Sequence, residues 1–334
     1  MRPNLHPYLV NGRFGDPALF VEVLHRRDAL LFDMGDLSAL STRDLLRIAH
    51  VFVTHMHMDH FIGFDALLRV NVGREKLIRI AGPEGLCDRL HHKLQGYEWD
   101  LAHRYATDLV FLATDVGTSG PLRSARFHFK QRFAWREEPC PAWPLDGGEG
   151  LQVEAVVLEH HGPCIGYAMA EPAHANVWPN LLADMGLAPG PWLKELKRAV
   201  LIGAGDEEPV RVPDGRRLPL GELRHLVSLS VGQKIAYVTD VADTPANRSL
   251  ITSLGNEADT LFIESRFAAA DAEQARERAH LTTRAAGEIA RAAQVGRVEP
   301  FHFSPRYDGE EERMIGEVMA AFGGEVVPCP NDPM

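Results

Sequence analysis

The sequence predicts an α/β layered domain, on the basis of its composition and its alternating patterns. Its 334 residues are 45% hydrophobic and 24% charged, which is ordinary for a globular protein. Short apolar runs alternate with helical patterns, which is typical of helices packed on sheets. The expected strands are residues 18–24, 29–33, 50–55, 76–82, 151–160, 164–170, 234–240, 260–265 and 297–303. The expected helices are residues 42–49, 61–70, 84–95, 245–254, 271–294 and 310–322.

Two regions interrupt this alternation. Residues 115–150 contain turn-forming stretches around a polar-alternating run, which predicts a hairpin with loops. Residues 171–224 are rich in Pro, Gly and charge, and a connection of that length inside a compact domain is usually functional or disordered. We therefore expect a single domain over residues 1–334, with residues 171–224 inserted in it as an arm or lid.

The charge and the cysteines limit the partners and the compartment. The formal net charge is −11, whereas a protein that wraps nucleic acid usually has a basic balance. A polyanionic substrate would therefore need a local basic patch or metal ions. The four cysteines form no C-x-x-C pair, and no apolar run reaches 18 residues. We therefore expect free thiols, no membrane insertion and a cytoplasmic location.

The sequence "VTHMHMDHFIG", residues 53–63, places three histidines and an aspartate directly after an apolar strand. His55 and His57 are two residues apart, so on an extended segment they project to the same side. Asp59 and His60 follow at once. These four side chains are too many for one tetrahedral ion and suit a pair of adjacent metals. The alternatives are an exposed polar loop or a single adventitious metal site.

Three more strand ends deliver metal-binding side chains. These are His160 in "VVLEHHGP", Asp240 in "IAYVTDVADT" and His302 in "VEPFHFSPRY". Each alone is a weak signal, because a single polar residue at a strand end more often caps the strand. Together with residues 53–63, they predict a dinuclear site at one edge of the sheets.

These motifs resemble the metallo-β-lactamase superfamily and, more narrowly, ribonuclease Z, the tRNA 3′-processing endonuclease. The resemblance rests on H-x-H-x-D-H at residues 55–60 and on six further segments that occur in the family's order. They are "LEHHGPCIGY", "MGLAPGPWLKELK", "IAYVTD", "ADTLFIESRF", "HLTTRAAGEIARAA" and "HFSPRY". The resemblance implies a four-layer αββα sandwich with a protruding arm at residues 171–224.

It also implies a ligand set. One metal would be held by His55, His57 and His160. The second would be held by Asp59, His60 and His302, with Asp240 bridging the two. The expected cofactors are two divalent ions, zinc first, with manganese or iron as alternatives. The G-Y register favours His160 over the adjacent His161, and a slip of one residue would exchange them.

Further roles follow from the same resemblance. Asp33, in "LLFDMGD", would orient the ligand loop from behind, or alternatively cap a helix or turn. His280 would protonate the leaving oxygen with Glu264 orienting it, unless it only caps the following helix. Asp59 would belong to the catalytic residues as well as to the ligands. The nucleophile would be a metal-bridging hydroxide.

The function implied is metal-dependent phosphodiester hydrolysis at the 3′ end of a tRNA precursor or another RNA. In the family the arm clasps the tRNA elbow, often from the partner subunit, so the resemblance also implies a homodimer. Basic residues in residues 171–224 are nearly balanced by six acidic ones from Glu195 to Glu222.

Several features depart from the family and keep other substrates open. The family's "GTGSAxPT" loop is here "NGRFGDPALF", and its "HEATF" is here "IESRF", which keeps Glu264. The alternatives are a phosphodiesterase for small molecules such as cyclic nucleotides, or another hydrolase such as a lactonase, thioesterase or β-lactamase. A flavodiiron redox enzyme and a non-catalytic RNA-binding scaffold fit the intact ligand set less well.

Overall fold

The computed structural model describes residues 4–148 and 150–323, which form two compact units. The large unit comprises residues 4–170 and 233–323, and the small unit comprises Glu171–Gly232. The small unit is thus inserted in the sequence of the large one. It includes the expected insertion at residues 171–224 and continues to Gly232. Each unit is described by itself.

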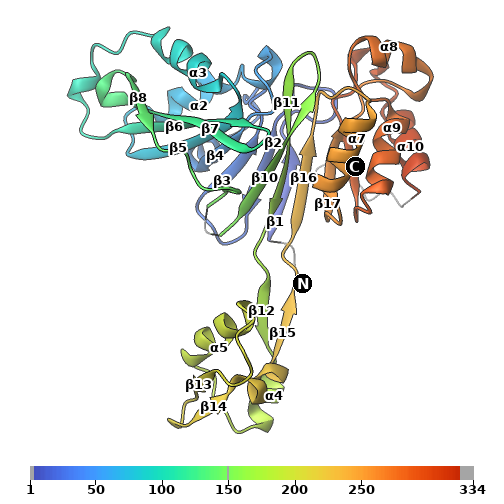
Figure 1. Cartoon of the computed structure of the whole chain (residues 1–334). Helices are drawn as coiled ribbons and strands as arrows, with labels where there is room; N and C mark the ends of the chain where they lie inside the picture. Colours follow the sequence, from blue (N-terminus) through green and yellow to red (C-terminus); the bar gives the residue numbers. More distant parts are fainter. Residues whose placement is uncertain (1–3, 149, 324–334) are drawn as a thin grey trace. The chain divides into compact units, whose positions relative to one another are not determined.

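The first sheet of the large unit has eight strands that follow one another in chain order (Figure 1). Neighbours from β3 to β6 run parallel and the remaining neighbours run antiparallel. The strands are β1 Leu5–Leu9, β2 Leu19–Val23, β3 Ala29–Phe32, β4 Ile48–Phe52, β5 Lys76–Pro83, β6 Leu109–Gly117, β7 Gly120–His128 and β8 Trp135–Glu138.

The second sheet has six strands in the order β18-β17-β16-β11-β10-β9. Its strands β16, β17 and β18 are parallel, and β11 joins them through an antiparallel pair with β16. The strands are β9 Leu145–Asp146, β10 Gln152–Glu159, β11 Pro163–Ala170, β16 Lys234–Val238, β17 Thr260–Glu264 and β18 Val298–Phe301. The carboxyl ends of its parallel strands therefore share one edge.

Helices cover the outer face of each sheet. The first sheet packs on α1 Thr42–Arg47, α2 Phe64–Asn71 and α3 Leu86–Gln95. The second packs on α7 Pro245–Gly255, α9 Thr283–Ala292 and α10 Glu311–Phe322. Side-chain oxygens fix several helix starts. Ser41 accepts from the amide of Asp44, and Thr282 accepts from that of Ala285. The other helical segments of this unit are η1 Met58–His60, η2 Ala102–Arg104, η3 Phe129–Gln131, η5 Ala269–Asp271, α8 Ala272–Glu277 and η6 Pro305–Tyr307.

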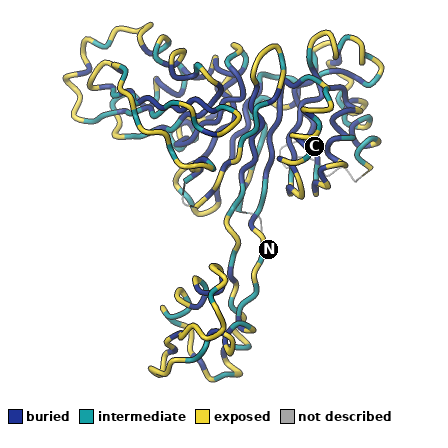
Figure 2. The backbone as a smooth tube through the Cα atoms, viewed as in Figure 1, coloured by how far each residue is buried: buried dark blue, intermediate teal, exposed yellow. Residues whose placement is uncertain are grey.

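A third apolar core lies between the two sheets and makes the unit a four-layer αββα sandwich. It is built from inward-facing strand residues of both sheets, among them Phe32, Phe52, Tyr167 and Tyr237. These rings stack or tilt against each other with centroids 5.2–5.9 Å apart. The predicted four-layer sandwich is therefore confirmed, and Figure 2 shows the buried interior along both sheets.

Several elements of the large unit differ from the prediction. Strands β1 and β6 were not expected, although β6 pairs with β5 along its length. The hairpin predicted within residues 115–150 corresponds to the antiparallel pair β7–β8. The single helix expected over residues 271–294 is two helices, α8 and α9. The chain turns between them, where Ala279 has a positive φ of 53°. This break sets the position of His280.

The small unit has its own apolar core of aliphatic side chains, including Leu182, Leu196, Val210 and Leu223. Two two-stranded sheets, β12–β15 and β13–β14, frame it with three short helices. The elements are β12 His174–Val177, α4 Pro179–Asp184, α5 Trp192–Leu201, β13 Pro209–Arg211, β14 Arg217–Pro219, α6 Leu220–Leu223, η4 Arg224–Leu226 and β15 Val227–Ser230. Among the described residues, no helix is long and apolar enough to span a membrane.

Candidate metal centre

Three site residues stand within two residues of the ends of parallel strands, in left-handed backbone conformations. Asp33 follows β3, Asp240 lies two residues after β16, and His302 follows β18. Their φ angles are 58°, 50° and 59°. Such angles are uncommon for residues other than glycine and cost on the order of 1 kcal/mol each. At these angles the backbone leaves the extended conformation of the strand. Asp33, Asp240 and His302 therefore lie at the carboxyl ends of their strands, where the metal centre is.

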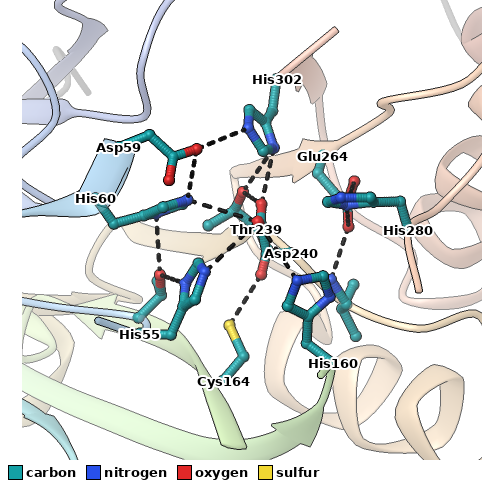
Figure 3. Close-up of polar contacts among 12 residues, drawn as sticks. His55, Asp59, His60, His160, Cys164, Thr239, Asp240, Glu264, His280 and His302 are labelled. Carbon is teal, nitrogen blue, oxygen red and sulfur yellow. Dashed lines mark hydrogen bonds and ion pairs between the residues drawn. The ribbon is translucent and has the colours of Figure 1, made fainter. Parts of the chain in front are cut away.

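The structure brings the seven predicted metal ligands together in two groups (Figure 3). Within each group, one ligand-type atom per residue lies within 4.8 Å of the others. The first group is His55, His57, His160 and Asp240, and the second is Asp59, His60 and His302. The histidines and Asp59 divide between the groups as the resemblance implied, and Asp240 falls in the first group.

Asp240 lies between the two groups. Its Oδ2 is 3.6 Å from Nε2 of both His55 and His60 and 3.8 Å from Nε2 of His160. Its Oδ1 is 2.8 Å from Nδ1 of His302. The three longer distances exceed hydrogen-bond range. A cation about 2.0–2.2 Å from each ligand atom can span them.

Two imidazole nitrogens support a metal at this place. Nε2 of His55 and Nε2 of His60 are buried and have no hydrogen-bond partner. A buried polar atom without a partner costs about 1–3 kcal/mol, so two of them facing the same carboxylate call for a ligand. A divalent cation bound by nitrogen and oxygen satisfies both. The donor set therefore fits the divalent metals that the sequence predicts.

The histidines of the centre have different pKa values. Burial, followed by the charge of His60, lowers the pKa of His55 to about 2, so its imidazole is neutral. Burial alone would lower the pKa of His60, but Asp33 and Asp240 outweigh it and raise that pKa well above its usual value. Burial would raise the pKa of Asp240, but His302 and His60 hold it well below its usual value. A cation at the His60 nitrogen would compete with its proton.

Asp33 supports the centre from behind, completely buried. Its Oδ1 accepts from the amide of Thr54 at 2.7 Å, and its Oδ2 accepts from Nδ1 of His60 at 2.9 Å. The hydroxyl of Tyr237 donates to the same Oδ2 at 3.1 Å. Because Asp33 accepts at Nδ1, the Nε2 of His60 faces the site. This is the orienting position that the sequence predicted, and no helix cap is involved.

His160, and not its neighbour His161, belongs to the first group. Nδ1 of His160 donates to the carbonyl of Ala279 at 2.8 Å, which aims Nε2 at Asp240. His161 is exposed. The turn between α8 and α9 therefore orients a residue at the end of β10.

The same turn places His280 beside Glu264. Nδ1 of His280 is 3.0 Å from Oε2 and 3.2 Å from Oε1 of Glu264, which is fully buried. Glu264 also accepts from the amide of Val241. His280 is 7% exposed, and a ligand-type atom of it lies within 4.8 Å of Asp240 and His302. Thr282 caps α9, so His280 has no capping role.

Comparisons with known proteins agree with this geometry. No protein-family model matches the chain. Ribonuclease Z from Deinococcus radiodurans is 34% identical over 88% of this chain and 88% of its own length. The chain belongs to the ribonuclease Z family.

Other members and solved structures extend the comparison. Ribonuclease Z from Thermobifida fusca is 32% identical over 89% of this chain and 82% of its own length. The metallo-beta-lactamase fold protein YhfI from Bacillus subtilis has a TM-score of 0.55 at 17% identity, covering 96% of this chain and 95% of its own. The short form of human tRNase Z has a TM-score of 0.51 at 18% identity, covering 91% and 92%. These two structures bear on the fold alone.

This ribonuclease Z family member has supporting residues that sequence reasoning missed. Oγ1 of Thr54 donates to Asp33 and lies 3.2 Å from Nδ1 of His55, and Oγ1 of Thr239 donates to Asp240 at 2.9 Å. Each threonine directly precedes a ligand at a strand end, a pattern that could have indicated them. Tyr237 gave no such signal.

Proposed function

We propose that this protein is a dinuclear metal-dependent phosphodiesterase that cleaves RNA, with the 3′ end of a tRNA precursor as its leading substrate. The observation that carries the proposal is the pair of His/Asp groups joined by Asp240 at the shared strand edge. The names of the curated relatives, ribonuclease Z and ribonuclease BN, support the RNA substrate.

Two divalent ions, with zinc as the proposed metal, would be held by the two groups with Asp240 between them. When bound, such ions neutralise phosphoryl oxygens and lower the pKa of a water to about 7. Asp59 is the most open carboxylate of the ligand set, because its side chain is 41% exposed. It faces the surrounding pocket and is placed to orient an attacking water as well as to bind metal.

His280 would supply the proton that the leaving oxygen needs. The Glu264 carboxylate accepts only, so Nδ1 of His280 carries hydrogen toward it and Nε2 is the nitrogen left for the substrate. A proton held at Nε2 would pass to the departing ribose oxygen, which leaves poorly as an alkoxide. This acid distinguishes phosphodiester chemistry from the hydrolysis of esters with good leaving groups.

The small unit supports an RNA substrate. Arg211 and Arg217 stand directly opposite each other in the β13–β14 pair, both exposed, and neither forms an ion pair among the described residues. Like charges at opposed positions destabilise a strand pair. A polyanion that binds both would remove that repulsion. We therefore propose that the unit Glu171–Gly232 is the arm that contacts RNA, and that the enzyme acts as a homodimer.

One assay series tests the proposal. Purified protein is given a tRNA precursor with a 3′ trailer, cyclic nucleotides and bis(p-nitrophenyl) phosphate under one metal condition. We expect cleavage at the trailer with a kcat/KM well above that for cyclic nucleotides. A higher kcat/KM for cyclic nucleotides would make the enzyme a small-molecule phosphodiesterase. Activity on lactones or β-lactams alone would contradict phosphodiester chemistry altogether.

A further inference from the structure

Arg266 is a cation beside the metal centre that no described carboxylate neutralises. It lies two residues after β17, is half-buried, and its Nη1 is 2.6 Å from Nε2 of His302. No described residue forms an ion pair with it. Other partly buried arginines of this unit differ, since Arg126 pairs with Glu138, and Arg248 pairs with Asp243 and Glu288. A guanidinium held partly out of water without an anion is costly, so its partner is expected outside the protein.

Arg266 lines an open pocket of about 280 Å³ that includes the reaction centre. Asp59, Asp240 and His280 line the same pocket, together with Glu277 and Arg278 from the end of α8. This volume lies at the lower end of the range of sites that bind small molecules or cofactors. Apart from the ligand carboxylates, two positive charges stand against the single negative charge of Glu277. This part of the wall therefore favours an anion.

A metal at His302 would leave Arg266 in need of another acceptor. Nε2 of His302 has one lone pair, which can serve either a metal or an N–H of Arg266. Asp59 and Asp240 belong to the ligand groups, and Glu277 forms no ion pair with Arg266. A guanidinium matches the geometry of a phosphate, with two parallel hydrogen bonds. The scissile phosphate is the group that the metals would neutralise, so a different phosphate remains for Arg266.

We propose that Arg266, assisted by Arg278, binds a second phosphate of the substrate next to the scissile one. The inference rests on the proposed function, because it takes the scissile phosphodiester to be held at the metal centre. It makes Arg266 a specificity-determining residue. A nucleotide chain, which carries a phosphate on each side of every nucleoside, engages this subsite, whereas a cyclic nucleotide with its single phosphate does not.

Matched nitrophenyl esters isolate the second phosphate. The first pair is thymidine 5′-(p-nitrophenyl phosphate) with and without a 3′-phosphate. The second pair is thymidine 3′-(p-nitrophenyl phosphate) with and without a 5′-phosphate, because the direction of the chain in the pocket is open. For one pair, we expect the second phosphate to raise kcat/KM about tenfold in the unaltered protein. In Arg266→Gln that preference falls to about one, and Arg266→Lys keeps part of it.

Arg276→Gln is the control, since Arg276 is an exposed arginine of α8 that does not line the pocket. It should preserve both rates and the preference. Glu277→Gln, which removes the opposing charge, should increase the preference. If Arg266→Gln lowers the rates for both members of each pair equally, Arg266 acts on the scissile phosphate or on His302 and the proposal is wrong.

A binding measurement separates this inference from the proposed function. Calorimetry gives the dissociation constants of thymidine 3′,5′-bisphosphate and thymidine 5′-phosphate, with metal content measured on the same samples. We expect the bisphosphate to bind about tenfold more tightly, and Arg266→Gln to remove that difference with metal content unchanged. If no diester is hydrolysed, the proposed function fails while this comparison still decides the subsite. Equal affinities in the unaltered protein would overturn the subsite.

Discussion

The two units of this molecule place their charged residues in opposite ways. In the large unit, His55, His60, Asp240 and His302 are each at most 5% exposed and face one another at the strand ends. In the small unit, the described core is aliphatic, and basic side chains such as Arg211 lie at the surface. Both units bury apolar side chains in the usual way, so the difference lies in the polar residues alone.

The difference indicates what each unit can do. Buried charges are costly unless they are paired or bind metal, so their presence in the large unit marks the place of chemistry. Exposed cations cost little and attract polyanions in a way that salt weakens. Substrate choice can therefore change through surface residues of the small unit while the hydrolytic centre stays the same. The following predictions test this division, beginning with the largest effect.

Asp240→Ala should be the most damaging single substitution. The carboxylate serves both ligand groups, and its loss leaves two dications without the charge between them. We expect activity on bis(p-nitrophenyl) phosphate to fall by more than the 10–100-fold that loss of an outer-shell residue costs. The fall should also exceed that of His55→Ala or His57→Ala. The control is Asp243→Asn, which removes a nearby surface ion pair with Arg248. Near-normal turnover of Asp240→Ala with both metals bound would refute the bridging role.

His280→Ala should show an effect that depends on the leaving group. The loss should be about 10²–10⁴-fold on RNA, because the ribose oxygen needs a proton. A p-nitrophenolate is stable near neutral pH, so the nitrophenyl ester should lose little. Glu264→Gln should give a weaker version of the same pattern. Equal losses on both substrates with intact metal content would assign His280 a structural role.

Asp33→Asn should weaken metal binding more than it changes the fold. An amide can accept from Thr54 but cannot accept from both Thr54 and His60 as the carboxylate does. We expect metal affinity to fall about 10–100-fold, with activity returning at high metal concentration. Tyr237→Phe, which removes one donor to the same carboxylate, should have a smaller effect in the same direction. An unchanged metal affinity in Asp33→Asn would show that the buried network does not orient His60.

The smallest effect is expected in the small unit. Arg211→Gln combined with Arg217→Gln should lower kcat/KM on a tRNA precursor about tenfold. It should also reduce the slope of log(kcat/KM) against log salt concentration by the amount expected for about two phosphate contacts. The loss should be confined to RNA, with hydrolysis of bis(p-nitrophenyl) phosphate as the internal reference. Arg216→Gln is the control, because Arg216 already pairs with Asp214. A parallel loss on both substrates would contradict the division between the units.

The sequence could indicate the residues that the structure brings together at the centre because they follow local patterns. His55, Asp240 and His302 each follow a recognisable apolar strand, and strand ends on one edge of a sandwich converge. Contacts between residues far apart in the sequence could not be predicted from local patterns. Tyr237 lies 204 residues from Asp33, and no local pattern connects them.

The sequence also did not reveal some details of the backbone. The helical pattern over residues 271–294 gave no sign of the turn at Ala279, whose positive φ a pattern of apolar spacing does not encode. Strand β6 was missed because no element was expected over residues 109–114, and residues 115–117 fell in the expected hairpin and loops. Arg266 contacts His302 because the ends of β17 and β18 lie side by side in the folded protein. The sequence alone does not show this.

Metal stoichiometry tests the two-group centre most directly. Protein stripped with a chelator is titrated with zinc, and bound metal per chain is measured together with the hydrolysis of bis(p-nitrophenyl) phosphate. The arrangement of His55, His57 and His160 on one side and Asp59, His60 and His302 on the other, with Asp240 between, predicts two ions per chain. Activity should rise mainly as the second ion binds. Full activity with one bound ion per chain would contradict the proposed centre.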